Sequence, residues 1–464
     1  MAYSGSTAAI LSNYSYVLKT FYLPAIREQI NNATVLMRRL KRNQESVSGK
    51  NATIAVHYGR NLGTIALGDG GALPDAGYQK VIETIVPMKY NYGRITVSGP
   101  TIAATRDSRG AYAKALDYEM KGLVKDMSKD INRQLWGCGQ GILARWQATT
   151  DSNTYVLQKS YLPSAGGAGF GSTFGSKYLM PEGATGMEAV PVVYTANSAI
   201  TVDTTSIAPS AVTINSTNDT ITATDPEVSE AAGTVWVKGN SSRAVLTSGD
   251  SDTETAPKEM MGIWGIVNNV SPCRAFSTGG ITAAASGLTG QNGLQGLSES
   301  SYSFWQANVL THASGRYGGQ RALTTDLMQE AVDYTEEQLS DDMGGAMSPS
   351  IILTTRAIRR KYVDLLVADK RFVDWKVMDG GYKVVEFNGI PIVVDNDAHG
   401  GEMYFLYEPA LQIYQMSDLE WMERDGSVLN RVAGYDAYEG TLFWYAELGA
   451  SRRNVQTVLC DIDY

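Results

Sequence analysis

The feature that most constrains the fold is one long amphipathic helix that directly follows a strand-rich segment. In residues 106–137 apolar side chains recur every three or four positions, at Leu116, Met120, Leu123, Met127, Ile131 and Leu135, which is the spacing of one helix face. Asp107 or Ser108 can cap the start of this helix, and Gly137 ends it. From Ser108 to Trp136 it would run about 43 Å at 1.5 Å per residue, more than twice the average globular helix.

The segment before this helix predicts strands joined by a long projecting loop. Asn51–Tyr58, Lys80–Val86 and Arg94–Ala103 are rich in β-branched residues. Between the first two lies the loop Gly59–Gly77, which contains the glycine-rich run GDGGALPDAG. A projecting hairpin is not stable alone. We therefore expect this loop to lie on something else, as a clasp in an assembly would.

The first 50 residues form a separate, basic unit. They contain seven basic and two acidic residues, whereas the whole chain has a formal net charge of −9. Pro24 fits the first turn of a helix, and an apolar stripe follows at Ile26, Ile30, Ala33, Met37 and Leu40. Two interpretations stay open: the helix packs on its own domain, or it is an arm on neighbouring subunits. The acidic body would repel a phosphate backbone, although a small basic arm could still meet nucleic acid.

The rest of the chain divides into a β-rich middle and a mixed α/β end. Residues 150–260 predict short strands broken by polar turns and are interpreted as an inserted domain. Later elements are a helix at Leu323–Leu339, a strand at Ser350–Leu353, a helix that Thr355 can cap, a hairpin of Lys383–Phe387 and Ile390–Asp395 around Asn388-Gly389, and strands at Met403–Tyr407, Gln412–Gln415, Thr441–Glu447 and Val455–Asp461.

No catalytic, cofactor or metal pattern emerges from the sequence. Three scattered cysteines and three scattered histidines form no zinc or disulfide framework. Asp395, Asp397 and His399 could approach a cation, but these residue types are ordinary turn formers at a strand end. We expect no signal peptide and no transmembrane helix. The chain is therefore expected not to be an enzyme and to need no cofactor.

The order of parts resembles the major capsid proteins of tailed bacteriophages, which have the α+β Hong Kong 97-type fold. The most similar stretch is SIILTTRAIRRKYVDLL…GYKVVEFNGIPIVVDND. The resemblance implies these parts: 1–50 N-terminal arm, 51–105 extended loop and flanking strands, 106–149 spine helix of a peripheral domain, 150–260 β-rich insertion, 261–348 remainder of the peripheral domain, 349–433 axial domain, and 434–464 C-terminal strands that return to the peripheral domain.

The resemblance also implies a function and a set of contact residues. The chain would form pentamers and hexamers of an icosahedral shell, assembled in the host cytoplasm, that encloses double-stranded DNA with little specific binding. Portal and scaffolding or decoration proteins would be partners, with no membrane. The implied residues are Gly68, Asp69, Leu73, Pro74, Tyr78 and Lys80 on the loop, Ile26, Ile30, Met37, Arg38, Arg39 and Leu40 on the arm, and the hinge glycines Gly93, Gly99 and Gly110.

Three alternatives remain at this stage. An encapsulin-type nanocompartment shares the same fold and would load protein cargo. A β-rich surface or adhesin protein would suit the Thr/Ser-rich middle, but the absence of an export signal and the long helix count against it. A hydrolase with an unrecognised site has no convergent motif in its favour.

Overall fold

The computed structural model describes about three fifths of the chain. The described residues are 35–49, 51–69, 71–104, 115–139, 141–151, 154–157, 181–182, 186–187, 189–194, 200–202, 213–215, 220–222, 234–238, 258–267, 294–297, 301–312, 320–339, 348–368, 375–377, 383–423 and 428–463. Ile26, Ile30 and Gly110 lie outside them, as do Asp107 and Ser108, the expected caps of the long helix.

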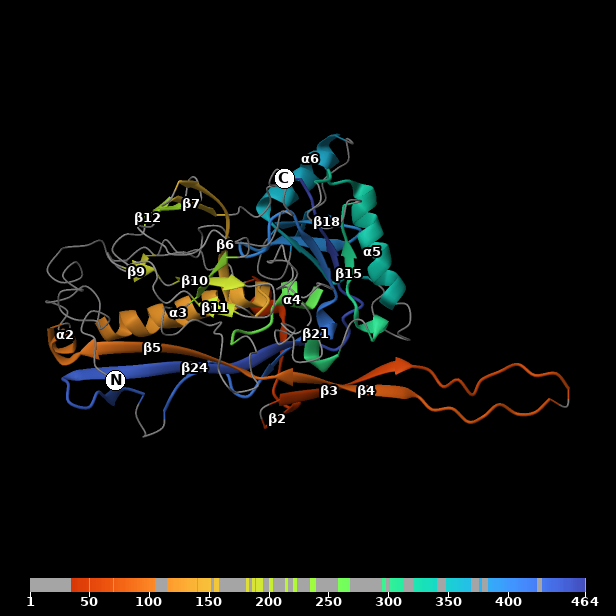
Figure 1. Ribbon diagram of the computed structural model, residues 1–464, viewed down its shortest axis with the longest axis horizontal. Coiled ribbons are helices and arrows are strands. Elements are labelled where there is room, and N and C mark those ends of the chain that lie inside the picture. Colours follow the sequence, from red (N-terminus) through yellow and green to blue (C-terminus); the bar gives the residue numbers. More distant parts are fainter. Residues whose placement is uncertain are drawn as a thin grey trace.

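A long helix lying along a sheet forms one half of the molecule (Figure 1). The helix α3 is Ala115–Trp136, which confirms the predicted long helix over its described length. The sheet, named the platform sheet here, consists of β1 (Lys41–Asn43), β5 (Lys89–Ser98), β21 (Leu411–Gln415), β22 (Glu420–Trp421), β23 (Asn430–Arg431) and β24 (Ala437–Ala450). Its longest pairing joins β5 to β24, and α3 packs on β5.

One expected strand is shifted. The segment predicted as strand 94–103 is β5, which begins at Lys89 and ends at Ser98, and residues 99–104 form the helix α2 (Gly99–Ala104). Pro100 explains the change, because proline lacks the N–H that a paired strand donates and fits the first turn of a helix.

A second body consists of a seven-stranded sheet, named the mixed sheet here, with two helices on one face (Figure 1). Its strand order is β15 (Asn308–Leu310), β25 (Thr457–Leu459), β20 (Met403–Leu406), β16 (Ile351–Thr354), β19 (Ile390–Val394), β18 (Lys383–Phe387) and β17 (Trp375–Val377). The helices are α5 (Thr325–Leu339) and α6 (Arg356–Ala368). The hairpin at Asn388-Gly389 is confirmed, with φ of 49° and 78° at its two turn residues.

Two details differ from expectation in this body. The final strand was expected to return to the peripheral domain with β24, but β25 pairs with β15 and β20, and its side chains are fully buried there. The mixed sheet thereby contains a parallel pair of β15 with β25, and β25 is a buried strand within it. The Thr355 hydroxyl does not cap α6; it is buried without a hydrogen-bond partner, and the Thr355 carbonyl accepts the Arg359 N–H instead.

Strands between Ile142 and Lys238 form a third sheet. Its described strands are β6 (Ile142–Asp151), β7 (Thr154–Leu157), β10 (Ala189–Tyr194), β11 (Ile200–Val202), β12 (Thr213–Asn215), β13 (Thr220–Thr222) and β14 (Thr234–Lys238), joined in the order β11-β10-β14-β6-β7-β13-β12. The short strands β8 (Pro181–Glu182) and β9 (Gly186–Met187) pair with each other. The first strand starts at Ile142, so this sheet begins before residue 150.

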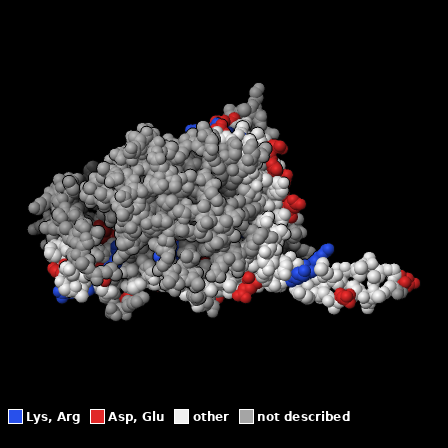
Figure 2. Space-filling model, viewed as in Figure 1, with Lys and Arg blue, Asp and Glu red and all other residues white. Residues whose placement is uncertain are grey.

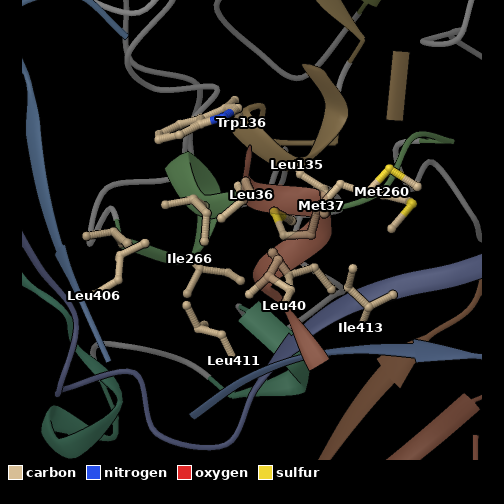
Figure 3. Packing of buried hydrophobic residues seen from close by; sticks show 14 of the residues in the cluster. Leu36, Met37, Leu40, Leu135, Trp136, Met260, Ile266, Leu406, Leu411 and Ile413 are labelled. Carbon is tan, nitrogen blue, oxygen red and sulfur yellow. The ribbon is translucent and has the colours of Figure 1, made fainter. Parts of the chain in front are cut away.

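A single apolar cluster joins the platform sheet to the mixed sheet (Figure 3). The short helix α1 (Val35–Arg39) places Leu36 and Met37 against Leu135 and Trp136 at the end of α3. The helix α4 (Ile263–Val267) and the three-residue helix η4 (Leu294–Gly296) add side chains to this cluster. The three-residue helices η5 (Ser303–Trp305) and η6 (Glu408–Ala410) contribute to smaller apolar clusters. Burial of this apolar area is the main stabilising term, at roughly 25 cal/mol per Å².

Polar groups fix the C-terminal end of α3 within this core. Arg133 forms buried ion pairs with Asp130 and Glu259. The Met261 N–H donates to the Glu447 carboxyl at 2.6 Å. These interactions connect Glu259 and Met261 to α3 and β24.

The three residues considered as cation ligands hold α3 instead. Asn132 donates to the Asp397 carboxylate at 2.7 Å, and His399 Nε2 lies 2.7 Å from the Trp136 carbonyl oxygen. The Asp395 carboxylate accepts the Asp397 N–H at 2.9 Å, as in an ordinary turn. In the part of the chain that the structure describes, no group of three or more His, Cys, Asp or Glu residues could hold a metal ion.

Candidate assembly surface: the projecting hairpin

The base of the hairpin is firmly attached to the body. The strands β2 (Val47–Ser48), β3 (Asn51–Gly59) and β4 (Lys80–Pro87) form a three-stranded sheet. Its inner face is apolar: Val56 packs with Leu297 and Trp305, and Ala52 and Val86 pack with Met88 and Tyr414. Alternation along β3 and β4 produces this face, because successive strand side chains point to opposite sides.

The ring of Tyr58 marks the limit of this attachment. It stacks on Phe304 at 5.2 Å between ring centroids. The next residue, Gly59, is the last of β3, opposite Lys80 across an irregular register.

Beyond Gly59 the loop is held mainly by itself. The Asn61 side chain accepts the Gly63 N–H at 2.7 Å and donates to the Gly77 carbonyl at 2.9 Å. Gly71 N–H donates to the Gly68 carbonyl at the tip. A Cβ on Gly77 would lie 2.1 Å from the Asn61 Oδ1, so the close approach of the two branches requires glycine. Figure 1 shows the loop extending far from the body.

The loop exposes many apolar side chains. The exposed fraction is 88% for Leu73 and 76% for Tyr78. The other large apolar residues exposed on the loop and at the start of β4 are Leu62, Ile65, Leu67 and Val81. Contiguous apolar exposure of this kind marks an interaction site in a folded protein.

Charge on the hairpin is separated along its length (Figure 2). The basic residues Arg60 and Lys80 lie where the loop leaves the strands, and the acidic residues Asp69 and Asp75 lie on the projecting part. Between them the surface carries no charge over most of the loop. A partner that covers the loop must therefore offer an apolar surface with a site for an acidic tip.

The structure brings all six predicted loop residues into this hairpin. Gly68, Asp69, Leu73, Pro74 and Tyr78 are exposed, and Lys80 is half-buried where β4 begins. The sequence reasoning missed the opposite branch, where Leu62, Ile65 and Leu67 are exposed. The sequence indicates these residues only by their spacing, because they are three large apolar residues, two or three positions apart, in a loop of otherwise small residues and glycines.

The described residues of the predicted arm lie in different environments. Met37 and Leu40 are buried in the chain's own core, so for these two the other interpretation holds: the helix packs on its own domain. Arg39 forms two hydrogen bonds with the Glu408 carboxylate, at 2.6 and 2.8 Å. Arg38 is exposed.

The two described hinge glycines are explained by packing. A Cβ on Gly93 would lie 2.9 Å from a Leu123 methyl, and one on Gly99 would lie 2.4 Å from the Asp436 carboxylate. Both glycines therefore permit a close approach between elements. Their role as hinges stays a prediction.

Comparison with known proteins identifies the fold. No family model matches the sequence, and no curated protein matches it. The capsid protein in the "Cyanophage A-1(L) capsid asymmetric unit" superposes with a TM-score of 0.52 at 13% identity, covering 95% of this chain and 96% of that one. The chain has the Hong Kong 97-type capsid fold.

Two further solved structures superpose with lower scores. The capsid of a native GTA particle has a TM-score of 0.47 at 8% identity, covering 98% of this chain and 99% of that one. The holo-SrpI encapsulin complex from Synechococcus elongatus has a TM-score of 0.43 at 9% identity, covering 98% and 95%. In the part of the chain that is described, no helix is long and apolar enough to span a bilayer.

Proposed function

We propose that this chain is the major capsid protein of a tailed bacteriophage, a non-enzymatic subunit that builds an icosahedral head around double-stranded DNA. The capsid fold supports a shell-building role. The observation that carries the proposal is the projecting loop, whose exposed leucines and tyrosine are costly in a monomer and useful in an assembly. Each large apolar side chain buried at a contact stabilises it by about 1.5–3 kcal/mol.

In this proposal the loop of one subunit lies across the next and latches it. Pentamers and hexamers form from the unit built on the mixed sheet, and the loop joins subunits around it. The acidic body suits a container wall, because packaged DNA does not adhere strongly to a surface of its own charge.

Deletion of Gly63–Gly77 tests the latch. The Asn61–Gly77 hydrogen bond shows that the two ends of this segment lie together, so the deletion joins Leu62 to Tyr78 without strain on β3 and β4. We expect a folded subunit with an unchanged circular dichroism spectrum and no stable shells in negative-stain electron microscopy. Intact shells from the deleted protein would contradict the latch.

The contents of native particles distinguish a phage head from an encapsulin. Both shells would share this fold. We expect particles from the natural source to protect double-stranded DNA of uniform length from nuclease. Particles that hold a single enzyme and no nucleic acid would favour the nanocompartment.

A further inference from the structure

The helix α5 carries a one-signed charge that the subunit alone does not explain. Its sequence contains five carboxylates and no lysine or arginine: Asp326, Glu330, Asp333, Glu336 and Glu337. Asp326 and Glu330, like Asp333 and Glu337, are four residues apart, a spacing at which like charges repel. Two of the acids lie in the last turn, where the helix dipole disfavours anions.

The helix α6 is charged in the opposite sense. Four of its first six residues are basic, namely Arg356, Arg359, Arg360 and Lys361, and no acidic residue lies in its first turn. The dipole at a helix N-terminus disfavours cations. Both helices thus hold charges where their own helix is destabilised by them.

Several of these charges have no ion-pair partner within the described part of the subunit. Asp326, Glu330 and Asp333 form no ion pair with any described residue, and neither do Arg356 and Arg360. Asp333 accepts a hydrogen bond from Gln329 at 2.6 Å. On α6, Lys361 lies 3.8 Å from Asp463.

The two charged faces lie at separate places on the same body. The helix α5 packs against β25, β15 and β20, whereas α6 packs against β19, across β16 in the strand order. In Figure 1, α5 runs along one side of this body and α6 crosses its end. Figure 2 shows the acidic residues along the edge formed by α5.

We propose that the basic face of α6 on one copy of this chain docks on the acidic face of α5 on the next copy. Two different faces that fit each other make a head-to-tail contact, and such contacts form a ring when the rotation between copies closes. Complementary charge fixes which faces meet and speeds their encounter. This inference rests on the proposed function for its setting and assigns the contact that joins neighbours within one ring.

Two charge-reversed proteins test the contact, R356E/R360E on α6 and E330K/D333K on α5. All four positions are exposed, so the free subunits should fold, as melting curves would verify. In either variant alone the altered positions place like charges opposite the unaltered face, so the attraction between the two faces falls. We expect the concentration needed for half-assembly to rise at least tenfold in sedimentation velocity. K121E, which changes an exposed cation on α3, is the matched control and should assemble normally.

Mixing gives a readout that loss of folding cannot imitate. The substituted positions on α6 of one variant carry the opposite charge to the substituted positions on α5 of the other, and the two unaltered faces also fit, so mixed rings alternate the two proteins. We expect six-membered rings from the mixture and none from either variant alone. The protein with all four substitutions has opposite charges again at the substituted positions of the two faces and should form rings by itself.

The outcomes separate this contact from the capsid role. If each reversed variant forms shells at the wild-type concentration, the α5–α6 contact is wrong and the capsid role stands. If the mixed variants bind each other but no protein forms shells, the contact stands and the capsid role fails. If the mixture stays monomeric at concentrations where the wild type forms rings, the contact is overturned.

Discussion

Among the large apolar side chains that the structure describes, Leu73 has the largest exposed fraction, at 88%. It touches little in its own subunit, so its removal acts on the assembly and not on the fold. We expect Leu73→Ser to change the free energy of unfolding by less than about 0.5 kcal/mol. The contact should weaken by about 2 kcal/mol, which raises the concentration for half-assembly more than tenfold.

Light scattering against protein concentration measures this effect. Met416→Ser is the control, because Met416 is also exposed, at 42%, but lies off the loop. Equal assembly by the two variants would show that Leu73 is an incidental surface residue.

Glu447 makes stability depend on pH. Burial raises the pKa of its carboxyl to about 7, against an ordinary value of 4.5, while Lys89 and the N–H groups of Met261 and Leu448 lower it. A folded pKa above the unfolded one stabilises the fold fully below pH 4.5, and this contribution is lost as pH rises towards 7.

Glu447→Gln removes this ionisation and keeps the carbonyl oxygen that accepts the two N–H groups. We expect the wild type to lose about 3 kcal/mol relative to the glutamine variant between pH 4.5 and pH 8, on the scale of 1.36 kcal/mol per pKa unit. Urea unfolding at several pH values measures the difference. Parallel stability curves for the two proteins would contradict a raised pKa.

At the scale of elements, the parts with a local cause were predictable from sequence. The long helix followed from its apolar spacing, the hairpin at Asn388-Gly389 from its turn residues, and the projecting loop from its glycines. The route of β25 into the mixed sheet could not be predicted, because its pairing with β15 joins residues far apart in the chain. Equally, the apolar spacing around Met37 is the same whether Met37 packs in the core of its own subunit or against a neighbouring subunit.

The end of α3 depends on one buried charge network. Arg133 is 2% exposed and pairs with Asp130 and with the buried Glu259. We expect Arg133→Met to cost about 3–5 kcal/mol, because it leaves the buried Glu259 carboxylate without its ion-pair partner. The control Lys361→Met removes a half-exposed pair with Asp463 and should cost less than about 1 kcal/mol.

Thermal unfolding of the two variants makes this comparison. The double variant Arg133→Met with Glu259→Leu should recover part of the loss, since it removes the orphaned charge as well. Equal melting temperatures for the variants at Arg133 and Lys361 would show that the network does not anchor α3.

At the scale of the whole molecule, the proposed latch predicts a difference between free and assembled subunits. Trypsin cleaves after lysine or arginine, and the loop between Arg60 and Lys80 contains neither residue. Arg60 is exposed and lies outside the strands, whereas Lys80 is half-buried and pairs with Gly59 of β3. In free subunits we therefore expect an early cut after Arg60.

In shells the same bond should be protected, because the loop lies on a neighbouring subunit and cannot open into the protease. Mass spectrometry of time points from dissociated and assembled protein measures both rates. A rate after Arg60 at least tenfold lower in shells, with similar rates at other exposed sites, supports a covered loop. Equal cleavage in both states would mean that the loop stays uncovered in the assembly, and a different surface would then have to hold the subunits together.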